Sequence, residues 1–222
     1  MRIALLSANL GNFDVNAKDP VKQDLPEGVS EITFHRFTDE DFPPIAGLTP
    51  RLQYRIPKLF GWQMFPGYDI YIWFDSSCSL QRADCVKWYL EQLGDCDMAF
   101  FRHPWRSTIK QEVDHIEEKL KLDHWYITPR YKNGLHKEFL EFIKQDEDFI
   151  DENLYASTAF IYKNNNASQI TMANWWSLQS RYFTCDQIHL PYAMFLTLGL
   201  KVKKILDNLF KIGYLSLVSH HR

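Results

Sequence analysis

An unbroken apolar stretch that ends on one acidic residue constrains the fold of this chain more than any other feature. Residues 70–74 read Ile-Tyr-Ile-Trp-Phe, and Asp75 follows directly. A run of this length without polar residues is typical of a strand that is buried on both faces of a sheet. Because a helix-like stretch follows, we expect the strand to belong to a parallel α/β sheet. Ligands bind such sheets at the carboxyl ends of the strands, and Asp75 falls at such an end.

The residues after this strand suit a ligand site. A carboxylate at Asp75, followed by the hydroxyl groups of Ser76 and Ser77, can hold a divalent metal or a polar ligand. The alternative interpretation is a plain turn, because Asp and Ser are also common turn residues. The sequence of these three residues leaves both interpretations open.

A basic cluster just upstream favours the ligand site. Arg51, Arg55 and Lys58 recur at steps of four and three residues, so a helical turn would place them on one face. Pro57 argues against a long regular helix here. A guanidinium and an ammonium beside a metal-binding carboxylate are suited to a diphosphate. The alternative is a solvated charged face.

Length and composition indicate one globular domain over residues 1–222. The chain has 222 residues, is 45% hydrophobic and carries a formal net charge of −3, so it can bury a sizeable core. Its positive charges are dispersed, which argues against a nucleic-acid partner. No stretch approaches the roughly 20 apolar residues of a transmembrane helix, and the start is unlike a signal peptide. None of the cysteines forms a CxxC pair, so we expect reduced thiols in a cytoplasmic protein.

Strand-like and helix-like segments alternate along the chain. Such alternation favours an α/β domain with a mostly parallel sheet flanked by helices. Capping-box patterns at Thr108 with Gln111, and at Asn166 with Gln169, mark two helix starts. Strands are expected at 2–7, 31–37, 70–74, 97–101 and 154–162, and helices at 81–93, from 108, from 166 and at 188–198.

The order of short motifs along residues 3–195 resembles one family. The motifs are Gly11 to Asp14, Phe37 to Asp39, Lys58, Trp73 to Asp75, His103 with Glu112, Trp175 with Trp176, and Asp186 with Gln187. This series is similar to that of a glycosyltransferase-like family first catalogued as a domain of unknown function. Some plant members of that family are linked to cell-wall and mucilage polysaccharides.

The resemblance implies a GT-A-like fold, in which a Rossmann-type sheet binds a nucleotide diphosphate sugar and usually Mn²⁺ or Mg²⁺. The acceptor would be a hydroxyl group of a glycan or polysaccharide. By the same analogy Gly11, Thr38 and Asp39 contact the nucleoside, and Arg55 and Lys58 contact the diphosphate. The alternatives are a tight turn at Gly11 and a loop or helix cap at Asp39.

The expected metal site departs from the common Asp-x-Asp pattern of GT-A enzymes. Asp75 supplies one carboxylate, and Ser77 stands where the second acid would be. One carboxylate plus a diphosphate can hold a hard cation only weakly. A later histidine often completes the site in such enzymes, and His220 or His221 is the candidate here. The alternative for both histidines is a frayed C-terminal tail.

Asp186 is the candidate for the chemistry. Glycosyl transfer needs a base on the acceptor or stabilisation of an oxocarbenium-like species, and a carboxylate can serve either role. Asp186 also precedes an apolar helix-like run, so a helix N-cap is the alternative. Candidate sugar or acceptor contacts are Ser77, His103, Arg106, Trp176 and Gln187.

Two other functional classes stay open at the level of sequence. A metal-dependent phosphohydrolase also uses a strand-end Asp with basic neighbours, although further clustered acids or histidines would be expected. A catalytically inactive protein that binds a nucleotide sugar or a glycan would tolerate the weak metal site. The sequence does not identify the donor sugar, the acceptor, the stereochemical outcome or the oligomeric state.

Overall fold

A six-stranded sheet forms the centre of the molecule, for which a computed structural model describes residues 1–217. Its strands are β1 (Arg2–Ala8), β2 (Glu31–Phe37), β3 (Ile70–Phe74), β5 (Met98–Arg102), β6 (Tyr155–Lys163) and β7 (Val202–Ile205). They lie in the order β2-β1-β3-β6-β5-β7. Only β6 runs antiparallel to its neighbours, while the other pairings are parallel. The expected α/β fold with a mostly parallel sheet is confirmed.

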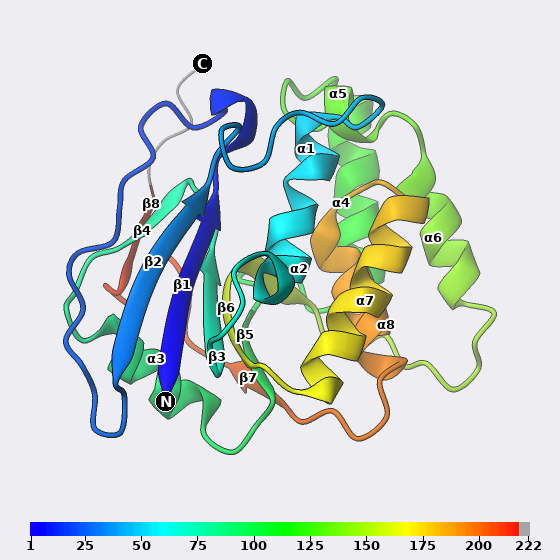
Figure 1. The fold of residues 1–222 in the computed structure, drawn as a ribbon. Coiled ribbons are helices and arrows are strands. Elements are labelled where there is room, and N and C mark those ends of the chain that lie inside the picture. The colour runs from blue at the N-terminus through cyan, green and yellow to red at the C-terminus, as the bar shows by residue number, and fades with distance from the viewer. Residues whose placement is uncertain (218–222) are drawn as a thin grey trace.

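Helices cover both faces of this sheet, as Figure 1 shows. On one face lie α2 (Arg55–Met64), α4 (Ile109–Lys121), α6 (Leu135–Ile143), α7 (Asn166–Arg181) and α8 (Asp186–Phe195), and on the other lies α3 (Cys85–Leu93). A short antiparallel ribbon pairs β4 (Cys78–Leu80) with β8 (Leu215–Leu217). Three short helices complete the described chain: η1 (Leu10–Asn12), α1 (Pro50–Gln53) and α5 (Thr128–Tyr131).

Burial on both faces explains the unbroken apolar run of β3. Tyr71 and Trp73 belong to the core cluster under α2, α7 and α8, whereas Ile70, Ile72 and Phe74 belong to the cluster under α3. Successive side chains of a strand point to opposite faces, so a strand between two helix layers must be apolar at every position.

Helix α2 packs on β1 with a glycine at the contact. A β-carbon at Gly61 would collide with Leu6 Cδ1. The side chain of Leu6 therefore packs directly against the backbone of α2, in space that a side chain at Gly61 would take. This contact fixes the helix whose first turn carries Arg55 and Lys58, and so positions two of the expected site residues.

Most expected elements are present, and one helix start is corrected. Thr108 caps α4 by accepting a hydrogen bond from the Gln111 amide at 3.1 Å, as predicted. Helix α7 instead begins one residue earlier than its predicted cap. Asn165 has an extended backbone and accepts from the Ser168 amide at 3.0 Å, while Asn166 is already helical.

None of the helices within residues 1–217 is both long and apolar enough to cross a membrane.

Candidate active site

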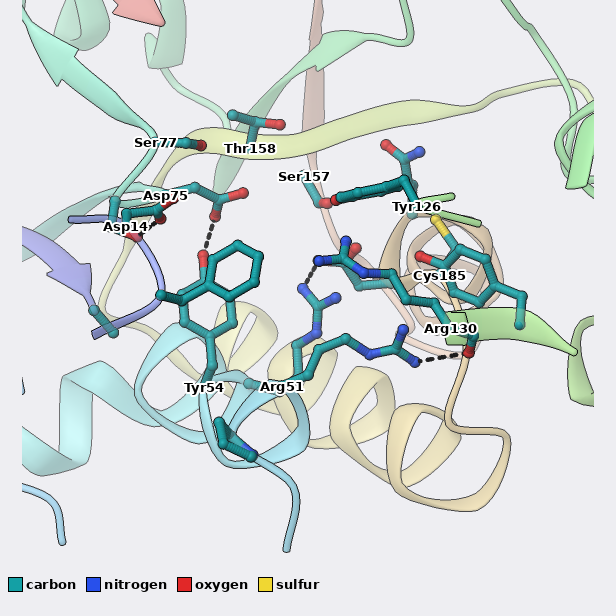
Figure 2. Close-up of a pocket in the computed structure, with 18 of the residues that line it drawn as sticks. Asp14, Arg51, Tyr54, Asp75, Ser77, Tyr126, Arg130, Ser157, Thr158 and Cys185 are labelled. Atoms are coloured by element: carbon teal, nitrogen blue, oxygen red, sulfur yellow. Dashed lines mark hydrogen bonds and ion pairs between the residues drawn. The ribbon is translucent and has the colours of Figure 1, made fainter. Parts of the chain in front are cut away.

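A cavity of about 370 Å³ lies at the edge of the sheet where β1 and β3 end. Its wall comes from the segment after β1, from α1 and the start of α2, from the turn after β3, and from the starts of β6 and α8. Figure 1 shows α1 and α5 above this edge. Figure 2 shows Asp14, Asp75 and Ser77 on one side of the cavity and Tyr126, Arg130 and Cys185 on the other. The cavity therefore lies at the carboxyl edge of the strands, where ligands bind parallel α/β sheets.

The floor of the cavity is a buried carboxylate held by two cations. Arg55 Nη1 donates to Asp186 Oδ2, and Lys58 Nζ donates to the same oxygen at 2.9 Å. Lys58 is 1% exposed, and Arg55 and Asp186 are also buried. The basic cluster predicted upstream of β3 thus meets the acid predicted for the chemistry.

These contacts fix the charge of Asp186. Burial on its own would raise the pKa of the Asp186 carboxyl, but Arg55 and Lys58 outweigh it and hold that pKa well below its usual range. The same attraction to Asp186 raises the pKa of Arg55 against the effect of burial. Asp186 therefore stays ionised throughout the physiological pH range and is a weak proton acceptor.

Asp186 is not the N-cap of α8. Cys185 occupies the N-cap position, and Asp186 is the first residue of the helix with its carboxylate turned to the cations. Its backbone carbonyl accepts a hydrogen bond from Trp175 Nε1 at 2.9 Å. The N-cap alternative is thereby excluded, since the side chain caps no backbone amide of its helix.

Asp75 is surrounded by donors at one of its two oxygens. Its Oδ1 accepts from Trp73 Nε1 at 2.8 Å, from Lys58 Nζ at 3.1 Å, and from the Tyr54 hydroxyl. Burial and the charge of Asp75 raise the pKa of Tyr54 well above its usual value, so the phenol remains a donor. Lys58 thereby links Asp75 to Asp186 across the floor.

Two arginines face the cavity without a carboxylate partner among residues 1–217. Arg51 donates to the backbone carbonyl of Arg130 at 3.4 Å, and its guanidinium lies 4.3 Å from the ring centre of Phe183. The Arg130 guanidinium lies 3.5 Å from the ring centre of Tyr126 and 5.5 Å from that of Phe13. Burial and the nearby charges of Arg55 and Arg130 lower the pKa of Arg51. Such a cluster of like charges is stabilised by an anion.

A separate ion pair, between Arg106 and Glu112, also lines the cavity. Arg106 Nε donates to Glu112 Oε2, and Gln187 Nε2 donates to Glu112 Oε1 at 3.3 Å. His103 lies behind this pair, outside the lining of the cavity. The structure thus brings three predicted sugar or acceptor contacts to the cavity wall, namely Ser77, Arg106 and Gln187.

Other predicted residues lie outside the lining. The amide of Gly11 donates to both carboxylate oxygens of Asp39 at 3.0 Å, and Thr38 starts the turn that carries Asp39. Gly11 has a φ of +65°, which agrees with its alternative interpretation as a turn residue. Trp176 packs against Phe60 beside the core. His220 and His221 lie outside the described residues.

The described residues provide only part of a metal site. Within residues 1–217, no group of three or more His, Cys, Asp or Glu side chains could hold a metal ion. Asp75 offers one further oxygen besides the Oδ1 that already accepts three hydrogen bonds. Asp14, which accepts a hydrogen bond from the Ser76 hydroxyl, lies near Asp75 (Figure 2). A hard divalent cation prefers six or more oxygen ligands, so most would have to come from a substrate and water.

The sequence analysis missed several residues of the cavity. Tyr54 had a signal, because it lies four residues before Lys58 in the basic stretch and so shares its helical face. Tyr126 and Arg130 lie in a stretch for which the sequence predicted neither a helix nor a strand, so no signal marked them. Ser157 lines the cavity because β6 is antiparallel and begins at this edge, and the sense of a strand cannot be read from its own residues.

Among the comparisons with known proteins, one family model matches this chain. The sequence model described as TOD1/MUCI70, glycosyltransferase-like domain, matches residues 48–218. No curated protein matches the chain. The apo structure of mouse xyloside xylosyltransferase 1 is similar with a TM-score of 0.45 and 7% identity, over 92% of this chain and 85% of that one. The apo structure of the bifunctional glycosyltransferase WbbM has a TM-score of 0.44 and 12% identity, over 91% of this chain and 38% of that one.

Proposed function

Because this chain belongs to the TOD1/MUCI70 glycosyltransferase-like family, we propose that it moves a sugar from a nucleotide diphosphate sugar to a hydroxyl group of a glycan. The family confirms the resemblance found in the order of the motifs. The site adds its own support, since the cavity lies at the carboxyl edge of a mostly parallel sheet and combines cations with carboxylates. A nucleotide sugar has a charged diphosphate and a neutral sugar, and such a mixed lining suits both parts.

The observation that carries this proposal is a pair of arginines that have no acidic partner within residues 1–217. Arg51 and Arg130 hold positive charge against aromatic rings rather than against carboxylates of the described chain. A diphosphate would supply the missing negative charge, and guanidinium groups bind phosphate oxygens in pairs. Arg55 and Lys58 were the predicted diphosphate ligands. Both already contact Asp186, so they would act on the diphosphate through their charge rather than by direct contact.

The donor would then lie along the cavity from β1 to α8. The segment after β1 contributes Leu10 and Phe13 to the wall, which suits a base and ribose at that end. Asp186 would face the sugar. Its depressed pKa favours a permanently charged carboxylate that stabilises developing positive charge over one that takes a proton.

A divalent metal belongs to the proposal as a partner of the diphosphate. Asp75 would hold Mn²⁺ or Mg²⁺ together with phosphate oxygens and water, and the ion would neutralise the leaving group. The contacts of Arg51, Arg130 and Lys58 described above do not depend on this ion.

A panel of nucleotide sugars with Mn²⁺ tests the proposal. A transferase releases nucleoside diphosphate, a metal-dependent phosphohydrolase releases inorganic phosphate, and an inactive binding protein shows only an increase in melting temperature. We expect nucleoside diphosphate, in an amount that rises when a glycan acceptor is added. Release of inorganic phosphate alone, or stabilisation without any release, would contradict transfer.

A further inference from the structure

Two aromatic side chains stack on each other beside the cavity but outside its lining. The ring centres of Trp105 and Phe210 lie 5.7 Å apart, with 25° between the ring planes. Trp105 is 69% exposed and Phe210 is 37% exposed. We propose that this pair is a platform for a pyranose ring of the acceptor glycan. That its ligand is an acceptor rests on the proposed transferase function.

The topology of the sheet places this pair at the same edge as the cavity. Strands β5 and β7 are parallel neighbours, with Phe101 opposite Ile205. The segments that follow them leave the sheet at one edge, side by side, and carry Trp105 and Phe210. The carboxyl ends of β1 and β3 lie at that edge too, because β3 and β5 both run antiparallel to β6.

A fixed turn directs Trp105 outward and Arg106 into the cavity wall. The buried side chain of His103 accepts hydrogen bonds at Nδ1 from the Trp105 amide at 3.4 Å and from the Arg106 amide at 3.1 Å. Arg106 is also tied to Glu112. Its guanidinium carbon lies 5.9 Å from the centre of the Trp105 ring. The backbone that carries Trp105 is therefore held by hydrogen bonds in the absence of a ligand, and the platform adjoins the cavity through Arg106.

The chemistry of such a platform suits a sugar ring. A pyranose with equatorial hydroxyl groups presents C–H bonds on its faces, and these pack on the electron-rich face of an indole. A rigid aromatic side chain gives up little conformational entropy on binding. A cavity of about 370 Å³ holds one small ligand, so an acceptor chain has to lie over its rim, where Trp105 is.

Isolated exposed hydrophobic residues are normal on protein surfaces and need no ligand. The Trp105–Phe210 pair differs because the two rings are stacked, one is held by a hydrogen-bonded turn, and the next residue lines the cavity. Leu198 is 96% exposed, has none of these features and serves as the matched control for loss of an exposed apolar side chain.

Glycan binding by the whole chain in the absence of donor tests the platform. The probes are cellohexaose, xylohexaose and an oligogalacturonide of the same length, measured by calorimetry. We expect Trp105→Ala to weaken binding of at least one probe roughly tenfold, because an aromatic stacking contact contributes on the order of a factor of ten in affinity. Trp105→Phe should keep part of the affinity, and Leu198→Ala all of it. Stabilisation by UDP or GDP should be the same in the wild type and in all three variants.

Unchanged glycan affinity in Trp105→Ala would overturn the platform, as would failure of the wild type to bind any of the three probes. A second exposed indole, Trp125, lies beside Tyr126 of the cavity wall. If Trp125→Ala lost glycan binding and Trp105→Ala kept it, the glycan would bind at Trp125, and the proposed platform would be overturned as well. Release of nucleoside diphosphate from the donor alone tests transfer separately, because hydrolysis by water does not use the platform.

Discussion

Lys58 Nζ lies 2.9 Å from Asp186 Oδ2, so the first turn of α2 is tied to the first residue of α8 across the floor of the cavity. The ammonium also reaches Asp75 Oδ1 at 3.1 Å. One buried cation thus serves two carboxylates that come from different parts of the chain. Arg55 supplies the second positive charge, so the two cations balance the charges of the two carboxylates.

Removing the ammonium group of Lys58 should therefore lower the stability of the folded protein. Lys58→Met keeps much of the apolar stem but leaves Asp75 and Asp186 close together without it. Loss of one partner from a buried ion pair costs about 3–5 kcal/mol. We expect a loss of that order in the free energy of unfolding, measured with urea.

The matched control for this variant is Lys110→Met. Lys110 forms an exposed ion pair with Asp114 within α4, and such pairs contribute about 0.3–0.5 kcal/mol. Similar losses in Lys58→Met and Lys110→Met would contradict the buried network.

The sequence predicted the sheet, and the edge of the sheet at which the cavity lies, because strands buried on both faces leave a clear signal. The apolar run of residues 70–74 and the alternation with helices were sufficient for the fold class. The position of Asp75 at a strand end followed from the same signal.

The partners within the site were not predictable in the same way. Spacing showed that Arg55 and Lys58 share a face, but not that this face meets Asp186, which is far along the chain. The antiparallel sense of β6, which brings Ser157 to the cavity, is decided by neighbouring strands. The position of Arg130 depends on contacts with Arg51 of α1 and with Phe13 after β1. Neither Arg130 nor Tyr126 lies in a local pattern of residues.

Arg130 should bind donor phosphate through its charge. Arg130→Gln removes a guanidinium that has no carboxylate partner within residues 1–217, so the fold should tolerate it. Loss of a hydrogen bond to a charged group costs about 1.5–3 kcal/mol, or roughly ten- to a hundredfold in the affinity for UDP or GDP. The deficit should shrink as salt is added, because salt screens the interaction.

Arg181→Gln is the control for this substitution. Arg181 also lies against aromatic rings, those of Phe142 and Tyr182, but outside the cavity lining. Calorimetric titration with UDP or GDP should give wild-type affinity for Arg181→Gln. Equal affinity in Arg130→Gln would remove Arg130 from the donor site.

The metal is tested at Asp75. If Asp75 and the diphosphate hold Mn²⁺ together, UDP or GDP should raise the melting temperature more with Mn²⁺ than with EDTA. Asp75→Asn should lose most of that difference, because a neutral amide oxygen binds a hard cation more weakly than a charged carboxylate. Ligand at a hundred times its dissociation constant stabilises a protein by about 2.7 kcal/mol, which a melting curve resolves. The same stabilisation with Mn²⁺ and with EDTA in the wild type would remove the metal from the proposal.

His103 should make stability depend on pH in the mildly acidic range. Burial and the charge of Arg106 lower the pKa of His103 from 6.5 to about 4. Between these values the unfolded chain binds more protons than the folded one, so stability is complete above pH 6.5 and falls as the pH approaches 4. His103→Asn keeps an acceptor but does not titrate, so it should lose less stability between pH 7 and pH 5 than the wild type. Urea unfolding at the two pH values measures this, and identical losses would contradict a depressed pKa.

The last prediction concerns the charge of Asp186 during transfer. Asp186→Asn keeps the shape of the side chain but removes the charge that faces Arg55 and Lys58. Its fold should be checked first by a melting curve with bound nucleotide, because the two cations lose their anion. In folded protein we expect nucleotide binding to survive and the turnover number to fall roughly a hundred- to a thousandfold, the usual cost of one preorganised electrostatic contact. Since the carboxylate is ionised at every assay pH, titration of Asp186 should not appear in the pH profile of turnover. The profile of Asp186→Asn should therefore have the same shape as that of the wild type. Wild-type turnover in Asp186→Asn, with donor and acceptor both saturating, would show that Asp186 only anchors the cations of the floor.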